Sequence, residues 1–473
     1  MATVKIDKFG GIAPRQHPTQ LADGMAVTAH NVKLKTGKLV PLRQPSLVKG
    51  VNILLENPLA NVSDAQSIHP WRKQDGTMDF LLFKGVTWMS EGNIADDDFT
   101  RVIISGDRDG DGKTDEPVLY MRDKVGNKVI HPIVKAPLAA PQVTRVSDTE
   151  LTDNRRYTRF FVTWVDKYGY ESPVSEPSLV WSAENDSWVA EDLEYMDGDI
   201  VSVELTDTEN LPEGIEKIRV YKVITGTEEG RIQFIAEKSK EIVEAGEWKL
   251  SVKVKDEDAG EVLLEIEAPP SDLQCILDVP GAFYCGFAKS APKTVMFSDI
   301  DLLYSWPIAY RYDVKDNIVA LAVTGNTVFA LTDGYPYVLS GTAPESMTVT
   351  KLAGPAACIA PRGVCVYRNA VYYVSNAGLM TIYANASSGT VCENLTDKIF
   401  TKEQWQAFNP ASCVMGQFDG ALHLFFDKID GSHIGLTIDL TESAATAVST
   451  HDEAAKCVCV DNATDKMYFV REG

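Results

Sequence analysis

The chain has 473 residues, of which 44% are hydrophobic and 24% are charged, and its formal net charge is −22. This length allows two or three domains with large buried cores. No run approaches the roughly 20 apolar residues that a membrane-spanning helix needs, and the N-terminus lacks the apolar stretch of a secretory signal peptide. We therefore expect no membrane span. The acidic balance also argues against sequence-specific DNA reading, which needs a basic patch.

The negative charge is concentrated in one part of the sequence. Residues 141–270 contain 14 Lys and Arg against 30 Asp and Glu, a net charge of −16, whereas the other 343 residues carry only −6. Such a field repels nucleic acid and keeps a long β-rich chain soluble.

The eight cysteines contain no C-x-x-C pair, and most stand singly on predicted strands, where Cys behaves as a small hydrophobic residue. We expect reduced, structural thiols in a protein made in a reducing cytoplasm, with disulfides or a metal site as the alternatives. The residues are Cys275, Cys285, Cys358, Cys365, Cys392, Cys413, Cys457 and Cys459.

Residues 1–50 are predicted to form an extended arm, because Gly and Pro recur and no periodic pattern is sustained. Such a segment is ordered only where the rest of the protein or a neighbour holds it.

Residues 51–140 show the alternation of apolar and polar residues that is typical of strands, and form the first part of a repeating domain. The runs Ile68–Trp71 and Met78–Phe83 flank Asp75-Gly76, a strong hairpin signal. After another turn, Val86–Met89 is expected to be the third strand of the same unit.

An Asp-rich loop, residues 107–115 (DRDGDGKTD), follows the predicted strand 98–106 and precedes another at 117–121. Calcium binds six to eight oxygens, and carboxylates at loop positions 1, 3, 5 and 9 with a carbonyl at position 7 could surround one ion. A structural Ca²⁺ site is therefore a hypothesis, although Val118 stands where an EF-hand has its bidentate Glu. The alternative is a solvated hairpin tip. The proposed ligands are Asp107, Asp109, Asp111, Asp115 and the carbonyl of Lys113.

Residues 141–270 contain several short alternating runs, among them Arg159–Asp166, Lys217–Ile224 and Arg231–Ala236. Short strands over some 120 residues predict a β-sandwich of the immunoglobulin or fibronectin type III kind. We expect an acidic sandwich inserted into the repeating domain.

From residue 271 to 473 a strand–turn–strand unit repeats. Its second strand begins near Ala282, Val328, Val371, Leu422 and Met467, at offsets of 46, 43, 51 and 45 residues. Periods of 40–50 residues with about four strands are typical of β-propeller blades. With the unit at 65–90, the sequence predicts an all-β fold with a propeller of about six blades. The last blade is short, so an N-terminal strand is expected to complete it.

Motifs of common enzymes are absent from the sequence, which has no G-x-S-x-G, H-E-x-x-H, P-loop or Rossmann fingerprint. The acidic pairs are too numerous to single out a glycosidase pair. The tryptophans fit roles in blades and sandwich better than a sugar-stacking platform, so no catalytic or cofactor-binding residues are proposed.

Several segments together resemble a family of tailed-phage virion proteins. The arm contains Phe9-Gly10-Gly11 with Pro14, the stretch Leu21 to Ala26, and Leu39 to Arg43, which are similar to the opening elements of that family. Further similar segments are FVTWVDKYGYESPVSEPS, IEKIRVYKV, VMFSDIDLLYSWP, LTDGYPYVLSGTAPESM and VSNAGLMTI. The resemblance covers nearly the whole chain, but the Asp-rich loop has no place in the family pattern.

The resemblance implies a structural component of the short-tail or head-to-tail machinery, such as the β-propeller nozzle of short-tailed phages. It implies a hexameric ring below the portal and adaptor, assembled in the host bacterial cytoplasm and located in the virion, with double-stranded DNA passing through. An acidic or neutral wall suits a DNA conduit because it offers phosphates no basic side chains. The alternatives are a propeller-based receptor- or glycan-binding tail protein and a propeller hydrolase.

Overall fold

The computed structural model describes residues 9–35, 38–92, 97–123, 125–205, 214–224, 231–239, 249–264, 266–353, 356–385, 389–440 and 447–471. Within these ranges the chain is nearly all β and about half of it is strand, as the sequence predicted. The described α-helix is α2 (Lys402–Gln406). Short 3-10 turns occupy Pro18–Gln20, Val62–Asp64, Asp256–Asp258, Ile308–Tyr310, Pro344–Ser346 and Pro410–Ser412.

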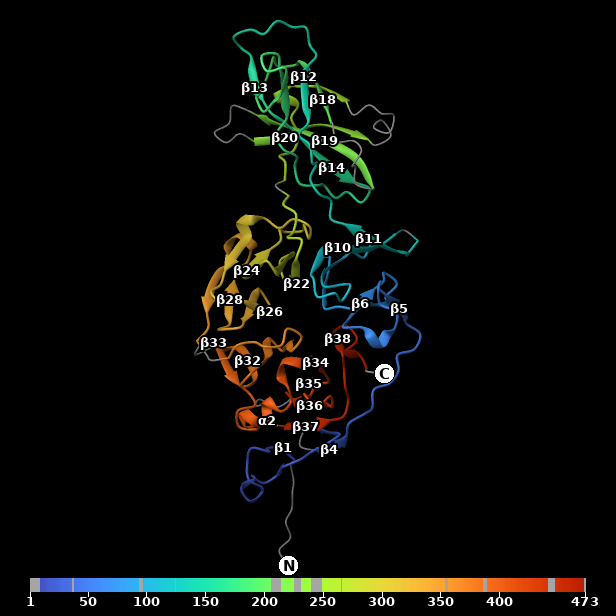
Figure 1. Ribbon diagram of the computed structural model, residues 1–473, viewed down its shortest axis with the longest axis vertical. Coiled ribbons are helices and arrows are strands. Elements are labelled where there is room, and N and C mark those ends of the chain that lie inside the picture. Colours follow the sequence, from blue (N-terminus) through green and yellow to red (C-terminus); the bar gives the residue numbers. More distant parts are fainter. Residues whose placement is uncertain are drawn as a thin grey trace, which may run out of the picture. The chain divides into compact units, whose positions relative to one another are not determined.

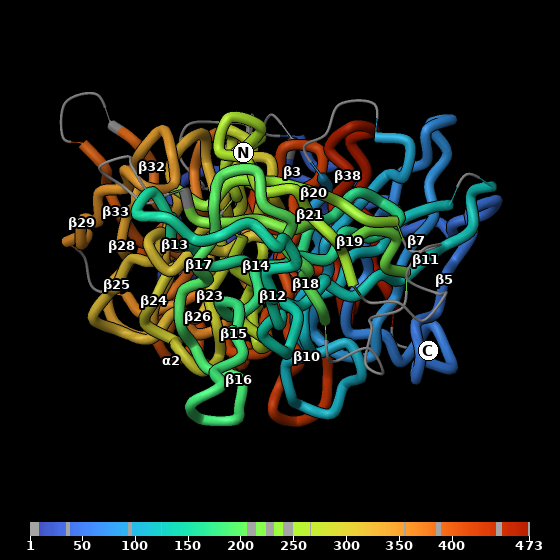
Figure 2. The backbone as a smooth tube through the Cα atoms, turned by 90° about the horizontal axis from the view of Figure 1, so that it is seen from above, coloured from blue at the N-terminus to red at the C-terminus, as the bar shows by residue number. Residues whose placement is uncertain are grey.

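The chain divides into two compact units (Figures 1 and 2). Unit 1 comprises residues 1–131, 270–303 and 308–473, and unit 2 comprises residues 132–269 with 304–307. The acidic range 141–270 of the sequence lies within unit 2 except for Pro270.

Unit 1 contains seven small sheets in addition to the strands of the arm, counted over its described residues. Five have four strands each, hydrogen-bonded in chain order, one has three strands, and one has two. The four-stranded sheets are β8 (Thr87–Glu91), β9 (Val102–Gly106), β10 (Asp115–Arg122), β11 (Lys128–Pro132); β22 (Leu273–Val279), β23 (Phe283–Ala288), β24 (Ala291–Phe297), β25 (Arg311–Asp313); β26 (Ile318–Thr324), β27 (Thr327–Thr332), β28 (Tyr337–Ser340), β29 (Thr348–Lys351); β30 (Val364–Tyr367), β31 (Ala370–Ser375), β32 (Gly378–Asn385), β33 (Gly389–Asn394); and β34 (Val414–Phe418), β35 (Ala421–Asp427), β36 (His433–Asp439), β37 (Ala447–His451). The smaller sheets are β5 (Asn52–Leu55), β7 (Met78–Phe83), β6 (Ser67–Arg72); and β38 (Cys457–Asp461), β39 (Lys466–Val470).

One edge strand of each sheet contacts the corresponding strand of the next sheet, and the series returns to its start. The contacts run from β6 to β8, β22, β26, β30, β34 and β38, and β38 contacts β6 again. The seven sheets of unit 1 therefore lie in a closed cycle. The five repeat positions found in the sequence mark the second strands β23, β27, β31, β35 and β39.

Two details of the predicted repeat are wrong. The strand expected at Val86–Met89 is not part of the unit with β6 and β7, because β8 pairs with β9 and begins a separate sheet. At Gly85, between these sheets, a Cβ would lie only 2.1 Å from the Asp107 carbonyl oxygen, so the chain crosses tightly against the Asp-rich loop. The cycle therefore holds seven sheets and not about six.

The prediction that an N-terminal strand completes the last sheet is also wrong, because no such strand joins β38 and β39 within the described residues. The N-terminal strand β5 pairs in parallel with β7 instead. Strands β38 and β39 remain a two-stranded sheet, whose side chains Cys457 and Val470 are buried against Ile68, Phe80 and Leu82 of the neighbouring sheet.

Unit 2 contains three sheets whose side chains share one core. The five-stranded sheet has the order β16-β15-β12-β18-β21, the three-stranded sheet β14-β19-β20, and a small sheet β13-β17. The shared core includes Val143 and Val201 from the first sheet and Phe160, Val162 and Val220 from the second. The strands are β12 (Gln142–Arg145), β13 (Arg156–Thr158), β14 (Phe160–Asp166), β15 (Leu179–Ser182), β16 (Ser187–Val189), β17 (Leu193–Tyr195), β18 (Ile200–Glu204), β19 (Ile215–Ile224), β20 (Arg231–Ser239) and β21 (Lys249–Lys253).

Three buried serines close the free edge of β14. Ser172, Ser175 and Ser178 each donate the backbone N–H to a carbonyl of β14 and accept the N–H of the same residue through Oγ. Their spacing of three residues matches every second residue of the strand, Trp164, Val162 and Phe160. A covered edge cannot pair with another chain, so this segment protects unit 2 against edge-to-edge association.

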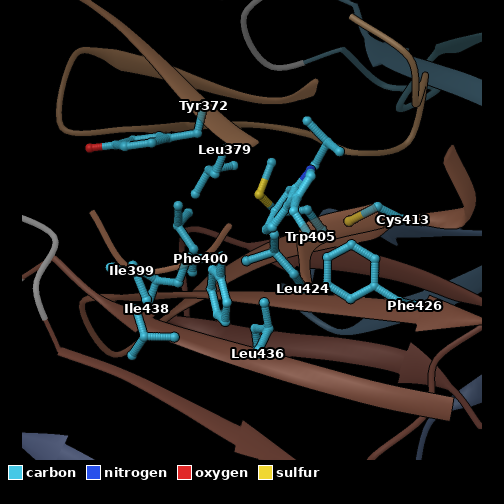
Figure 3. Close-up of a cluster of buried hydrophobic side chains, with 14 of the residues drawn as sticks. Tyr372, Leu379, Ile399, Phe400, Trp405, Cys413, Leu424, Phe426, Leu436 and Ile438 are labelled. Atoms are coloured by element: carbon cyan, nitrogen blue, oxygen red, sulfur yellow. The ribbon is translucent and has the colours of Figure 1, made fainter. Parts of the chain in front are cut away.

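The core of unit 1 consists of apolar clusters between neighbouring sheets. Figure 3 shows one, in which Tyr372 and Leu379 from the β30–β33 sheet and Leu424 and Leu436 from the β34–β37 sheet lie around Trp405 of α2. Trp405 is buried, and its Nε1 donates to the Ser375 carbonyl at 2.8 Å. A capping box starts α2: the Thr401 side chain accepts the Gln404 N–H, and the Gln404 side chain accepts the Thr401 N–H.

Candidate functional site

The Asp-rich loop connects β9 and β10, and its first carboxylate is engaged by the loop's own backbone. Asp107 Oδ1 accepts from the Gly110 N–H at 2.6 Å, and Oδ2 accepts from the Gly112 N–H at 3.0 Å. Both glycines have positive φ, +71° and +84°, a conformation that other residues rarely adopt. The glycines therefore allow the loop to fold back on the Asp107 carboxylate.

Two further carboxylates are also used within the loop. Asp111 accepts the Lys113 N–H at 2.8 Å, and Asp115 accepts the Arg108 N–H at 2.7 Å. Lys289, from the next sheet of the cycle, donates to the Gly112 carbonyl at 2.9 Å. The side chains of Arg108 and Lys113 lie 3.7 Å from Asp115 and 3.6 Å from Asp111. Backbone N–H groups and these two basic side chains thus offset the repulsion between the loop carboxylates.

This arrangement does not fit a calcium ion as it stands. A calcium site needs several oxygens directed at one point, and the described residues contain no group of three or more His, Cys, Asp or Glu side chains placed to hold a metal. Of the proposed ligands, Asp107, Asp111 and Asp115 accept N–H bonds instead. The assignment of Asp107, Asp109, Asp111, Lys113 and Asp115 to Ca²⁺ stays a prediction.

A cavity of about 350 Å³ lies between the first strands of four sheets in the cycle. Its walls are mostly apolar, with Asp278 as the one carboxylate among the described lining residues. The lining residues are Trp88, Cys275, Leu277, Asp278, Leu321, Ala322, Val323, Pro361, Val364, Cys365 and Val366. An apolar wall of this kind offers few groups for acid–base or nucleophilic chemistry.

One arginine connects sheets that are not neighbours in the cycle. Arg362, just before β30, donates from Nη1 to the Lys456 carbonyl at 2.7 Å, the Gln66 carbonyl at 3.2 Å and Gln66 Oε1 at 3.1 Å. Gln66 precedes β6 and Lys456 precedes β38, and the Arg362 carbonyl accepts from Met415 of β34. Burial lowers the pKa of Arg362. The side chain therefore joins the start of β30 to the starts of β6 and β38, and the backbone carbonyl adds β34. Nothing in the local A-P-R-G sequence predicts this role.

The arm is attached to the edge of the β34–β37 sheet. Its strands are β1 (Gly11–Ile12), β2 (Met25–Ala26), β3 (Val32–Lys35) and β4 (Lys38–Pro41). The Thr450 N–H donates to the Ala29 carbonyl at 2.9 Å, and the Asn31 N–H donates to the Thr450 carbonyl at 2.8 Å. The Ser449 hydroxyl also donates to the Val32 carbonyl of β3 at 2.7 Å. The arm is thus held by β3 and the residues just before it, whereas every residue of β4 is exposed.

Two buried histidines lie in the sheet to which the arm is attached. The rings of His423 and His451 are 6.2 Å apart, and neither ring nitrogen of His451 has a hydrogen-bond partner among the described residues. Charged or polar groups near them are Lys33, Asp419, His30, Asp452 and Thr437. Burial is the main cause that lowers the pKa of each histidine to about 4. Both are neutral near pH 7, because burial disfavours the charged imidazolium.

All eight cysteines are free, and five of them are buried: Cys275, Cys285, Cys358, Cys413 and Cys457. Burial raises the pKa of the Cys275 and Cys358 thiols to about 12. Thiols of this kind are poor nucleophiles because they stay protonated near neutral pH.

Comparisons with known proteins give no family for this chain. No family model matches it, and no curated protein matches it. Among solved structures, Citrobacter koseri AztD is 11% identical with a TM-score of 0.27, covering 66% of this chain and 75% of AztD. A Mycobacterium tuberculosis puromycin-hydrolyzing peptidase is 11% identical with a TM-score of 0.26, covering 77% of this chain and 52% of the peptidase.

An ancestral GH74 enzyme is 10% identical with a TM-score of 0.27, covering 79% of this chain and 53% of the enzyme. The chain thus spans about half the length of the peptidase and of the GH74 enzyme. In the part of the chain that the structure describes, no helix is long and apolar enough to cross a membrane.

Proposed function

We propose that this chain is a non-enzymatic structural protein of a phage virion, a nozzle or tail component at the head–tail junction. The observation that carries the proposal is the closed cycle of seven small sheets in unit 1, which we interpret as a β-propeller. Unit 2 is interpreted as an inserted sandwich of the fibronectin or immunoglobulin kind, since two sheets share one core. The virion assignment rests on the sequence resemblance.

The proposed role is assembly, and three features support it. The centre of the cycle is lined by apolar side chains and tied by Arg362, five of the eight cysteines are buried, and the acidic charge lies mainly in residues 141–270. In this role, copies of the chain form a ring, expected to be hexameric, that contacts the portal or adaptor and other tail proteins. Double-stranded DNA passes through the ring without sequence-specific binding.

Electron microscopy of assembled particles tests the proposal. The expected result is a ring of this protein at the head–tail junction, labelled by an antibody against residues of unit 2. Particles that lack such a ring, or a ring built from another protein, would contradict it. A control antibody against the major capsid protein shows that the labelling works.

The second candidate is a receptor- or glycan-binding tail protein, and one observation favours it. Trp181 and Trp188 form an aromatic pair in unit 2, with Trp181 47% exposed, Trp188 half-buried and the ring centroids 5.7 Å apart. Exposed aromatic faces can stack on sugars. A glycan array with the purified protein separates the two candidates, because the ring proposal predicts no sugar binding.

A further inference from the structure

The hairpin β15–β16 of unit 2 carries an unusual exposed surface. Trp181 and Trp188 are directly opposite in the pairing of the two strands, and Trp181 is 47% exposed. In Figure 2 the green loop labelled β15 and β16 extends beyond the other strands of its unit. In the described sheet, β16 is the outermost strand and one of its edges is unpaired.

Negative charge surrounds this aromatic pair. Residues 168–216 contain 14 acidic residues and no Lys or Arg. Glu184, Asp186 and Glu191, in the turn of the hairpin and directly after it, are all exposed. Tryptophans are frequent energetic centres of protein interfaces, and the face of a Trp ring attracts a cation. The hairpin therefore suits a partner that is basic, extended and partly apolar.

The arm has the complementary properties. Residues 24–55 contain five Lys and Arg and no Asp or Glu, in a chain whose net charge is −22. Lys38, Arg43 and Lys49 are exposed, and so are the apolar side chains of Leu39 and Leu47, the latter by 83%.

The middle of the arm is also unpaired along its backbone. Within the described chain, residues 43–50 make no backbone hydrogen bond with any other described residue. An extended segment with free N–H and C=O groups and exposed leucines needs another surface to become fully ordered. It can supply an additional strand to an open sheet edge.

We propose that the β15–β16 hairpin of one copy binds the arm segment 38–50 of a second copy of this chain. Arg43 or Lys49 lies against the Trp181–Trp188 pair and the carboxylates of Glu184, Asp186 and Glu191, and the extended segment runs along the open edge of β16. This inference rests on the homo-oligomer of the proposed function and names the contact that holds its copies together.

The features of the segment favour a protein surface over a nucleic acid. Its basic residues alternate with Leu and Val and are not accompanied by aromatic side chains that could stack on bases. The hairpin itself is acidic and repels phosphates. A second copy of the same chain supplies both the basic segment and its acidic, aromatic counterpart.

A peptide-binding experiment tests the contact with the full-length protein. A synthetic peptide of residues 38–55 is titrated into the protein and followed by calorimetry and tryptophan fluorescence. We expect saturable binding that weakens with salt and falls at least tenfold in the variant Trp181→Ala and in the triple variant Glu184→Gln, Asp186→Asn, Glu191→Gln. Asp430→Asn, in an exposed turn of unit 1, is the matched control and leaves binding unchanged.

Each variant must keep the circular dichroism spectrum and the melting temperature of the natural protein, so that a folding failure is excluded. We expect this result because the substituted side chains are mostly exposed. A peptide with Arg43→Glu and Lys49→Glu should not bind. Absent binding of the natural peptide, or binding that Trp181→Ala leaves intact, overturns the proposal. The proposal is also overturned if the protein binds duplex DNA through Arg43, so that Arg43→Glu abolishes DNA binding, while the peptide does not bind.

Sedimentation of the intact protein separates this inference from the ring itself. The proposed contact is supported if Trp181→Ala and Arg43→Glu each weaken self-association. The double variant Trp181→Arg with Arg43→Glu should also associate weakly, because a new ion pair does not replace the aromatic contact. Self-association that both variants leave intact overturns the contact but keeps the ring. A chain that stays monomeric while the peptide binds at the hairpin supports the docking site and contradicts the ring.

Discussion

The two units differ in net charge more than in their use of buried ion pairs. Residues 141–270, nearly all in unit 2, carry a net charge of −16, and in this unit Lys222 is fully buried against Asp256. The rest of the chain carries only −6, and unit 1 also buries ion pairs, with Arg122 2.7 Å from Asp79 and Lys128 2.6 Å from Glu56. The comparison teaches that both interiors pair their buried charges, while the surplus of negative charge lies mainly in unit 2.

The largest effect is expected from removing the counter-ion of the buried Lys222 in unit 2. Asp256 accepts from Lys222 Nζ and from Arg156, and the Tyr195 hydroxyl is 3.3 Å from its Oδ1. Asp256→Ala leaves a buried ammonium without a counter-ion, which costs about 3–5 kcal/mol of unfolding free energy. Lys222→Met removes the charge instead and should change stability by less than about 1 kcal/mol.

Urea unfolding of unit 2, followed by hydrogen exchange at β19, measures both changes. Asp258→Ala, an exposed residue of the same turn, is the control and should be neutral. Equal losses in Asp256→Ala and Lys222→Met would show that the pair itself stabilises the unit, against the expectation.

The second prediction concerns the pH dependence of unit 1. Because the pKa of His423 and of His451 is lowered to about 4 from 6.5, the unfolded chain binds protons that the folded chain does not between these values. The free energy of unfolding is therefore highest above pH 6.5. It falls as the pH decreases towards 4, by up to about 3 kcal/mol for each histidine.

Melting temperatures between pH 7 and 4 measure this loss. His451→Met should flatten the curve, whereas His17→Ala, at an exposed histidine of the arm, should leave it as in the natural protein. If the melting temperature of His451→Met falls as steeply with pH as that of the natural protein, other groups cause the acid sensitivity.

A smaller effect is expected at the arginine that ties the cycle. Arg362→Ala leaves the carbonyls of Gln66 and Lys456 without their donor, and hydrogen bonds from a charged group contribute about 1.5–3 kcal/mol. Hydrogen exchange should increase in β6, β30 and β38 together, since the Arg362 side chain joins the starts of these three strands. Arg368→Ala, in an exposed turn of the same sheet, is the control and should cost less than about 0.5 kcal/mol.

The smallest effect is expected in the Asp-rich loop. Asp107→Ala removes two N–H acceptors and should cost about 1 kcal/mol. Asp109 makes no hydrogen bond or ion pair with the described residues, so Asp109→Ala should be neutral. A melting temperature that rises with calcium, falls with a chelator and no longer responds in Asp109→Ala would establish the calcium site after all.

The repeat of unit 1 was predictable because each second strand is a compact apolar run after a tight turn, as at Val328 and Val371. The sequence pattern did not predict the sheet β8–β11 as a separate unit, because a long connection separates β8 from β9 and the Asp-rich loop separates β9 from β10. The strand pattern alone also placed β8 with the wrong sheet, since a turn at Gly85 looks the same whether the chain stays in a sheet or leaves it.

Other features had no local signal. Arg362 acts on Gln66 and Lys456, which are far away in the sequence, so only the three-dimensional arrangement brings them together. Trp181 and Trp188 were expected to fill the sandwich, and only the pairing of β15 with β16 shows that they lie together with Trp181 exposed.

The central claim is that the seven sheets form a closed cycle whose role is assembly into a ring. A cryo-EM reconstruction of the purified virion tests it most directly. The account predicts copies of this chain around the particle axis at the head–tail junction, each with seven radially arranged small sheets. An open row of sheets, or the absence of the chain from that junction, would contradict it.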